Sequence, residues 1–111
     1  MKDINQVHIS GRLTRDPIIG SNGKTSARIV VASNEHFRDG TGALQERTAF
    51  VFCKIFGGLA QIVQNRKKGD VVMVTGRLRT DRGVDNRQPQ LVLICDSVQF
   101  PVSALDPGSN P

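Results

Sequence analysis

The sequence predicts an all-β fold, a small barrel of five strands with one short helix between the third and fourth strands. Apolar and polar residues alternate with period two in several segments, which is typical of strands with one buried and one solvent-facing side. A single segment has helical periodicity instead. With 111 residues, the chain is long enough for one domain and too short to bury a second core.

The first strand is predicted over residues 7–13. Its core side carries Val7, Ile9, Gly11 and Leu13, and its polar side carries His8, Ser10 and Arg12. Asp16-Pro17 then ends the segment, because proline cannot donate a backbone hydrogen bond to a sheet.

The second strand is predicted over residues 26–31. Ala27, Ile29 and Val31 alternate there with Ser26, Arg28 and Val30. We expect residues 34–46 to form a loop with Asp39-Gly40-Thr41-Gly42 at its tip, because aspartate and glycine favour the tight turn of a hairpin.

The third strand, predicted over residues 47–56, has two distinct faces. One carries small apolar residues suited to a barrel interior, namely Ala49, Val51, Cys53 and Ile55. The other carries three rings around a cation, namely Phe50, Phe52, Lys54 and Phe56. A sheet buried on both faces would also produce this pattern. Because the chain has only five aromatic residues, all phenylalanine, three on one face favour an exposed surface where nucleobases stack and the lysine meets phosphate.

Residues 59–69 are predicted to form a helix of about three turns. Leu59, Ile62, Val63 and Arg66 fall on one helical face. Basic residues occupy the last turn, and Gly69 provides the stop that commonly follows a helix.

The fourth strand is predicted over residues 71–80. Its inward side carries Val72, Val74 and Leu78, and its outward side carries Met73, Thr75, Arg77 and Arg79. Residues 81–89 are predicted to form an exposed basic hairpin loop, and residues 91–100 return as the fifth strand.

This order of elements is that of the OB-fold, a five-stranded Greek-key barrel with its helix between strands three and four. An SH3-like barrel lacks that helix, and a ferredoxin-like fold needs two. The domain is predicted to span residues 1–100. Residues 101–111 contain three prolines and no periodicity, so we expect a disordered C-terminal tail or the start of one.

Charge, apolar runs and cysteine spacing limit the classes of function that the chain can have. A formal charge of +5 favours polyanionic partners such as nucleic acid. No apolar run approaches the ~20 residues of a membrane span, and the N-terminus has no signal-peptide pattern, so we expect a cytoplasmic protein without membrane contact. Cys53 and Cys95 match no metal-ligand spacing, which predicts buried, reduced thiols and neither metal nor cofactor.

From Ile4 to Phe100 the chain resembles the bacterial-type single-stranded DNA-binding protein (SSB) family. Four motifs occur in the family's order. They are Val7-His8-Ile9-Ser10-Gly11-Arg12-Leu13-Thr14-Arg15-Asp16-Pro17, Phe56-Gly57-Gly58-Leu59-Ala60, Lys68-Gly69-Asp70 with Gly76-Arg77-Leu78-Arg79-Thr80, and Asp96-Ser97-Val98-Gln99-Phe100. The resemblance implies an OB-fold, usually assembled as a homotetramer, with single-stranded DNA wrapped over its outer surface.

The resemblance also implies which residues contact DNA. The stacking aromatics of the family fall on Phe37, Phe50 and Phe56, and Phe52 shares the face of the last two. A further family aromatic falls near Arg82-Gly83, where this chain has none. Because phenylalanine offers less area than tryptophan, which is absent here, we expect basic residues to contribute phosphate contacts. The candidates are Arg12, Arg28, Arg38, Lys54, Arg77, Arg79 and Arg82.

The C-terminus departs from the family. Relatives usually end in an acidic, Phe-terminated tip that recruits replication and repair proteins, whereas the last residues here are Gly108-Ser109-Asn110-Pro111. Either the sequence stops before such a tip, or this is a reduced version carried by a phage or mobile element. Single-stranded DNA is therefore the expected partner, and replication and repair proteins are possible further partners. We expect the protein to be associated with the nucleoid.

Three other functions fit the sequence less well. An enzyme is disfavoured because His8 and His36 belong to no catalytic or metal-binding constellation and Gly40-Thr41-Gly42 lacks the Lys-Ser/Thr ending of a phosphate loop. A dimeric primosomal-type replication adaptor has the same fold. Native mass distinguishes the two, because a dimer favours the adaptor and a tetramer favours the single-stranded DNA-binding protein. Sequence-specific RNA binding predicts discrimination between sequences, which stacking on phenylalanine does not provide.

Overall fold

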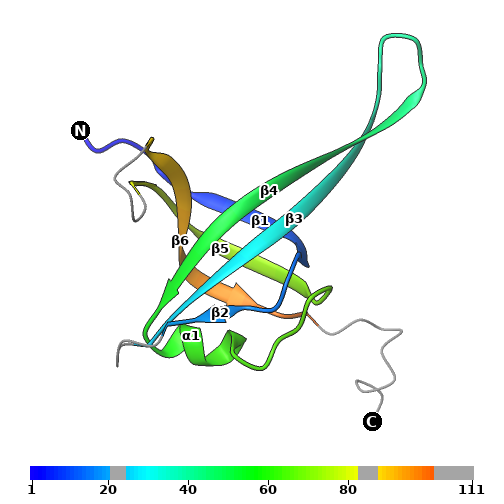
Figure 1. Cartoon of the computed structure of the whole chain (residues 1–111). Helices are drawn as coiled ribbons and strands as arrows, with labels where there is room; N and C mark the ends of the chain where they lie inside the picture. The colour runs from blue at the N-terminus through cyan, green and yellow to red at the C-terminus, as the bar shows by residue number, and fades with distance from the viewer. Residues whose placement is uncertain (21–24, 83–87, 102–111) are drawn as a thin grey trace.

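The barrel is built from five long strands, one very short strand and one helix. The computed structural model describes residues 1–20, 25–82 and 88–101. Its elements in chain order are β1 (Val7–Leu13), β2 (Ile18–Ile19), β3 (Ser26–Arg38), β4 (Leu44–Phe56), α1 (Gly58–Val63), β5 (Val71–Asp81) and β6 (Gln90–Gln99) (Figure 1). The strands are ordered β1-β5-β6-β4-β3-β2, and β1 also pairs with β3, which closes the sheet. The predicted five-stranded OB-fold with a helix between strands three and four is confirmed.

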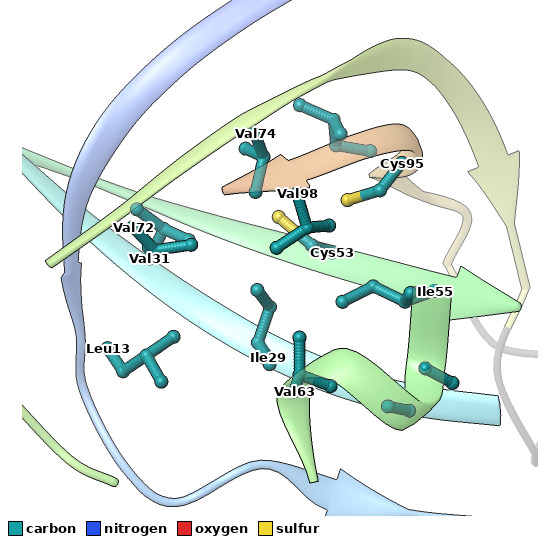
Figure 2. Packing of buried hydrophobic residues seen from close by; sticks show 13 residues of the cluster. Leu13, Ile29, Val31, Cys53, Ile55, Val63, Val72, Val74, Cys95 and Val98 are labelled. Carbon is teal, nitrogen blue, oxygen red and sulfur yellow. The ribbon is translucent and has the colours of Figure 1, made fainter. Parts of the chain in front are cut away.

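The core fills the inside of this barrel with small aliphatic side chains (Figure 2). Fully buried members include Leu13, Ile29, Ile55 and Leu93, each contributed by a different strand. Cys53 and Cys95 are buried and are not joined by a disulfide. A hydrogen bond with Cys95, together with burial, raises the pKa of the Cys53 thiol above its ordinary value. Both cysteines are therefore core residues, as predicted.

The helix is shorter than predicted. It covers one end of the barrel with Ala60 and Val63 buried, and ends at Val63 instead of continuing to residue 69. After the helix, the backbone forms hydrogen bonds with the end of β1 and the residues that follow it. The Lys68 N–H donates to Asp16 Oδ1 at 2.7 Å, and the Gly69 N–H donates to the Leu13 carbonyl at 2.8 Å. These tertiary bonds, with Gly69 at φ 92°, replace the last helical turns.

The segment predicted as a loop over residues 34–46 is mostly strand. β3 and β4 pair continuously from Ser26 opposite Phe56 to Arg38 opposite Leu44. The outer part of this hairpin, residues 34–48, is called the arm below, and it projects beyond the barrel (Figure 1). The tip turn was predicted correctly: the Gly42 N–H donates to the Asp39 carbonyl at 3.0 Å, and Gly42 has φ 85°.

Two residues predicted to face the interior are exposed. Ala49 lies where β4 leaves the barrel, so no opposing sheet covers it. Leu78 lies beyond the part of β5 that β1 covers, because that ladder ends at Gly76. At Leu78 the Asn5 side chain replaces the backbone partner that β1 would provide. It accepts from the Leu78 N–H and donates to the Leu78 carbonyl, both at 2.8 Å.

Parts of two predicted segments lie outside the described residues. These are residues 83–87 of the predicted β5–β6 loop and residues 102–111 of the predicted tail. Within the described ranges, no helix combines the length and apolar character required to cross a bilayer.

Candidate nucleic-acid interface

One side of the barrel carries aromatic and basic side chains on neighbouring strands. The β3–β4 register places Val30 opposite Phe52 and Arg28 opposite Lys54, while β6 places Ile94 beside Lys54. Directly paired residues point to the same side of a sheet. We call this surface the outer wall; its members are Arg28, Val30, Phe50, Phe52, Lys54, Phe56, Arg77, Arg79, Asp81, Val92, Ile94 and Asp96.

The three β4 rings on the outer wall are exposed. Phe50, Phe52 and Phe56 keep 63%, 50% and 48% of their surface accessible. Alternate residues of a strand are separated by about 7 Å, so Phe50 and Phe52 are neighbours and Phe56 stands two steps further along. An exposed ring offers a flat apolar face on which a nucleobase can stack.

A group of almost fully buried apolar residues, called the apolar floor below, lies beside these rings and was not predicted from the sequence. Val30, Val92 and Ile94 belong to the outer wall, yet only 7%, 7% and 5% of their surfaces are exposed. They lie beside Phe52 and Lys54 on adjacent strands. The available signal was the unbroken apolar run Leu91–Cys95, which fits a strand covered on both faces.

The cations of the outer wall differ in their partners. Lys54 forms an ion pair with Asp81, and Arg77 Nη1 donates to Asp96 Oδ1 at 2.9 Å. Among the residues that the structure describes, Arg28 and Arg79 have exposed side chains without an ion pair or side-chain hydrogen bond. Arg28, Lys54 and Phe56 also line a shallow hollow of about 80 Å³. This hollow brings a ring and two cations together.

Three predicted phosphate contacts lie at the margins. Arg12 is in register with Ala32, which faces Phe50, but its guanidinium donates to the Gly69 carbonyl at 3.0 Å. Arg82 is exposed just past the end of β5. Arg38 is on the arm and donates to the Gly42 carbonyl at 2.9 Å.

Phe37 is separated from the other rings. It is an odd-numbered position of β3 opposite Gln45, so it lies on the other face of the hairpin from Phe50. The ring is half-buried under the Arg47 guanidinium, whose Cζ lies 4.5 Å from the ring centroid. Arg47 also lines a hollow of about 290 Å³ with Ser33 and Glu35. Sequence reasoning missed Arg47 because Phe37, which it covers, lay in the segment predicted to be a loop, so the pairing of the two strands was not foreseen.

The arm tip is organised by one carboxylate. Asp39 accepts hydrogen bonds from the Thr41 hydroxyl at 2.6 Å, the Thr41 N–H at 2.8 Å and the Gln45 amide at 2.9 Å. Bonds from Thr41, and then from Gln45, lower the pKa of Asp39 from 3.8 to about 2. The carboxylate is therefore ionised at neutral pH and fixes the turn.

The described part of the chain offers no assembled metal centre. No three or more His, Cys, Asp or Glu side chains within it are grouped to hold a metal ion.

Comparisons with known proteins identify the family and the fold of the chain. The model of the Single-strand binding protein family matches residues 4–101. "Single-stranded DNA-binding protein 1" of Chlorobaculum tepidum is 36% identical over 116 residues, covering 98% of this chain and 71% of that protein. The fold resembles that in "Plasmodium falciparum SSB complex with ssDNA", with TM-score 0.81, 23% identity, and 92% and 98% of the two chains covered. The family match over nearly the whole barrel shows that the chain belongs to the single-strand binding protein family.

Proposed function

We propose that this protein binds single-stranded DNA across the outer wall. Bases stack on Phe50, Phe52 and Phe56, and Arg28 and Arg79 contact the phosphates on either side. The observation that carries this proposal is the exposure of three rings on β4, with a cation on the adjacent strand β3 and another on β5, across β6 from the rings. Membership of the single-strand binding protein family supports it.

The chemistry of the wall favours tolerance of DNA sequence. A phenylalanine ring has no hydrogen-bonding group, and every base offers a π-face. Stacking contributes about 1–3 kcal/mol per base by alanine substitution, and the smaller phenylalanine ring belongs in the lower part of that range. The residues of the apolar floor, Val30, Val92 and Ile94, are already almost fully buried and offer a base little surface of their own, so the exposed rings provide the apolar contact.

We infer the wider role from this binding mode. A sequence-tolerant binder coats and protects unwound DNA during replication, recombination and repair, working as a homo-oligomer, with a homotetramer expected, and located with the nucleoid in the cytoplasm. The arm, with Phe37, Arg38 and Arg47, extends the basic and aromatic surface beyond the barrel. It gives a wrapped strand a second place to bind.

The test is a titration with oligo-dT of increasing length, with simultaneous mass measurement. We expect tight binding to the single strand, weak binding to duplex, affinity that falls as salt rises, and four protomers per complex. Equal binding to duplex and single strand would contradict the stacking proposal. A dimer that binds DNA weakly would favour the replication adaptor.

A further inference from the structure

Two cations of the outer wall are already neutralised by carboxylates of the same wall. Lys54 pairs with Asp81, and their side chains are only 23% and 26% exposed. Arg77 pairs with Asp96 from the neighbouring strand. Both carboxylates therefore sit on the surface that carries the exposed rings.

A carboxylate in this position resembles a phosphate chemically. Both are anions that accept charge-assisted hydrogen bonds from an ammonium or a guanidinium. When a DNA phosphate approaches Lys54 or Arg77, it must displace Asp81 or Asp96, or share the cation with that carboxylate. The Arg77–Asp96 pair is more than half exposed, and such surface pairs are weak, whereas the Lys54–Asp81 pair is about three-quarters buried and is harder to displace. In both cases displacement reduces the gain from the phosphate contact.

The remaining carboxylate also opposes binding directly. Once displaced, its charge lies within a few ångströms of the incoming phosphate, and like charges at such distances repel. Arg28 and Arg79 present the contrasting case, because neither has such a partner among the described residues. The wall thus combines two available cations with two that are occupied.

We propose that Asp81 and Asp96 are affinity-setting residues of the outer wall, which compete with DNA phosphates for Lys54 and Arg77. This inference rests on the proposed function. The two carboxylates lower the affinity for DNA, so that a bound strand can be exchanged. When DNA is absent, they hold the cations in place.

The primary test uses the isosteric variants Asp81→Asn and Asp96→Asn with oligo-dT at low salt. Asp96→Asn is expected to bind about two- to fivefold more tightly than the wild type, the range of a weak surface pair. Asp81→Asn is expected to increase affinity at least as much, and both variants should dissociate more slowly. The matched control is Asp16→Asn, which removes the same charge and a lysine pair (to Lys67, 3.9 Å) away from the outer wall. It should change affinity less.

A double-mutant cycle isolates the competition from overall charge. Lys54→Met should weaken DNA binding more in the Asp81→Asn background than in the wild type, because only there is the ammonium free for phosphate. Melting temperatures establish that each variant is folded. Since the two pairs are separate, Asp96→Asn carries the test if Asp81→Asn does not fold.

The outcomes separate the two proposals. If the wild type fails to bind single-stranded DNA, the proposed function is wrong. If it binds, but both Asn variants bind no more tightly than Asp16→Asn, the competition is overturned. Weaker binding by the Asn variants would also overturn it, since the carboxylates would then be orienting the cations for DNA.

Discussion

Arg28 lies directly opposite Lys54 across the β3–β4 ladder, on the face that carries Phe52 and Phe56. The two cations differ in availability, because Asp81 pairs with Lys54 while Arg28 has no such partner among the described residues. Arg28 is therefore the cation nearest to the rings that is free to meet a phosphate.

Arg28→Gln should weaken binding to all single-stranded sequences alike. Losing one phosphate contact is expected to reduce the slope of log K against log salt by about 0.7. Affinity measured at several salt concentrations provides the check. Arg15→Gln, an exposed arginine before β2, is the control for net charge. An unchanged slope in Arg28→Gln would place the phosphates elsewhere.

Phe56→Ala and Phe50→Ala should weaken DNA binding more than Phe100→Ala. The two β4 rings are exposed, whereas Phe100 packs against the core and lies 4.3 Å from the Arg66 guanidinium. We expect about 1 kcal/mol loss of binding for each β4 ring. Phe100→Ala should instead lower the melting temperature. Equal affinities for the three variants would refute the assignment of the β4 face.

The arm tip should loosen in acid through Asp39. Its pKa is lowered from 3.8 to about 2, so the ionised carboxylate stabilises the folded tip. This contribution is complete above pH 3.8 and is lost as the pH falls through about 2. The Thr41 amide resonance should titrate near pH 2 in NMR spectra. A midpoint near 3.8 would show that the hydrogen bonds do not hold in solution.

Gly76→Ala should destabilise the barrel by more than about 2 kcal/mol. A Cβ at this position would lie 1.9 Å from the Ile94 carbonyl oxygen, at the register shift between β5 and β6. Gly40→Ala is the control, since a Cβ at that turn position meets nothing within 4 Å. Thermal unfolding compares the two. Similar melting temperatures would mean that the strands can separate locally without cost.

Most barrel strands could be predicted because they have one face in a core and one largely in water, whereas β6 is buried on both faces from Val92 to Cys95 and was found from its apolar run. Val7 to Leu13 and Val51 to Ile55 show the alternation that this difference produces. The arm gives no such signal. Residues such as Glu35 and Glu46 are exposed on both of its faces, so its strands have no apolar side and look like a loop.

The end of the helix and the orientation of Phe37 could not be predicted, because both depend on tertiary contacts. Residues 64–69 keep a helical pattern, but hydrogen bonds to Leu13 and Asp16 draw that backbone into another course. Phe37 matched a stacking position by resemblance alone. Only the β3–β4 register shows that it faces away from Phe50. The ion pairs of Lys54 and Arg77 join distant parts of the chain, so alternation within one strand could not reveal them.

The most direct measurement compares oligo-dT with an abasic oligonucleotide of equal length, each titrated with wild-type protein and with the Phe56→Ala variant. If bases stack on the outer wall, the wild type prefers oligo-dT, and Phe56→Ala loses affinity for oligo-dT while binding the abasic strand as the wild type does. An equal loss of affinity for both oligonucleotides would show that Phe56 does not receive a base, and would contradict the account.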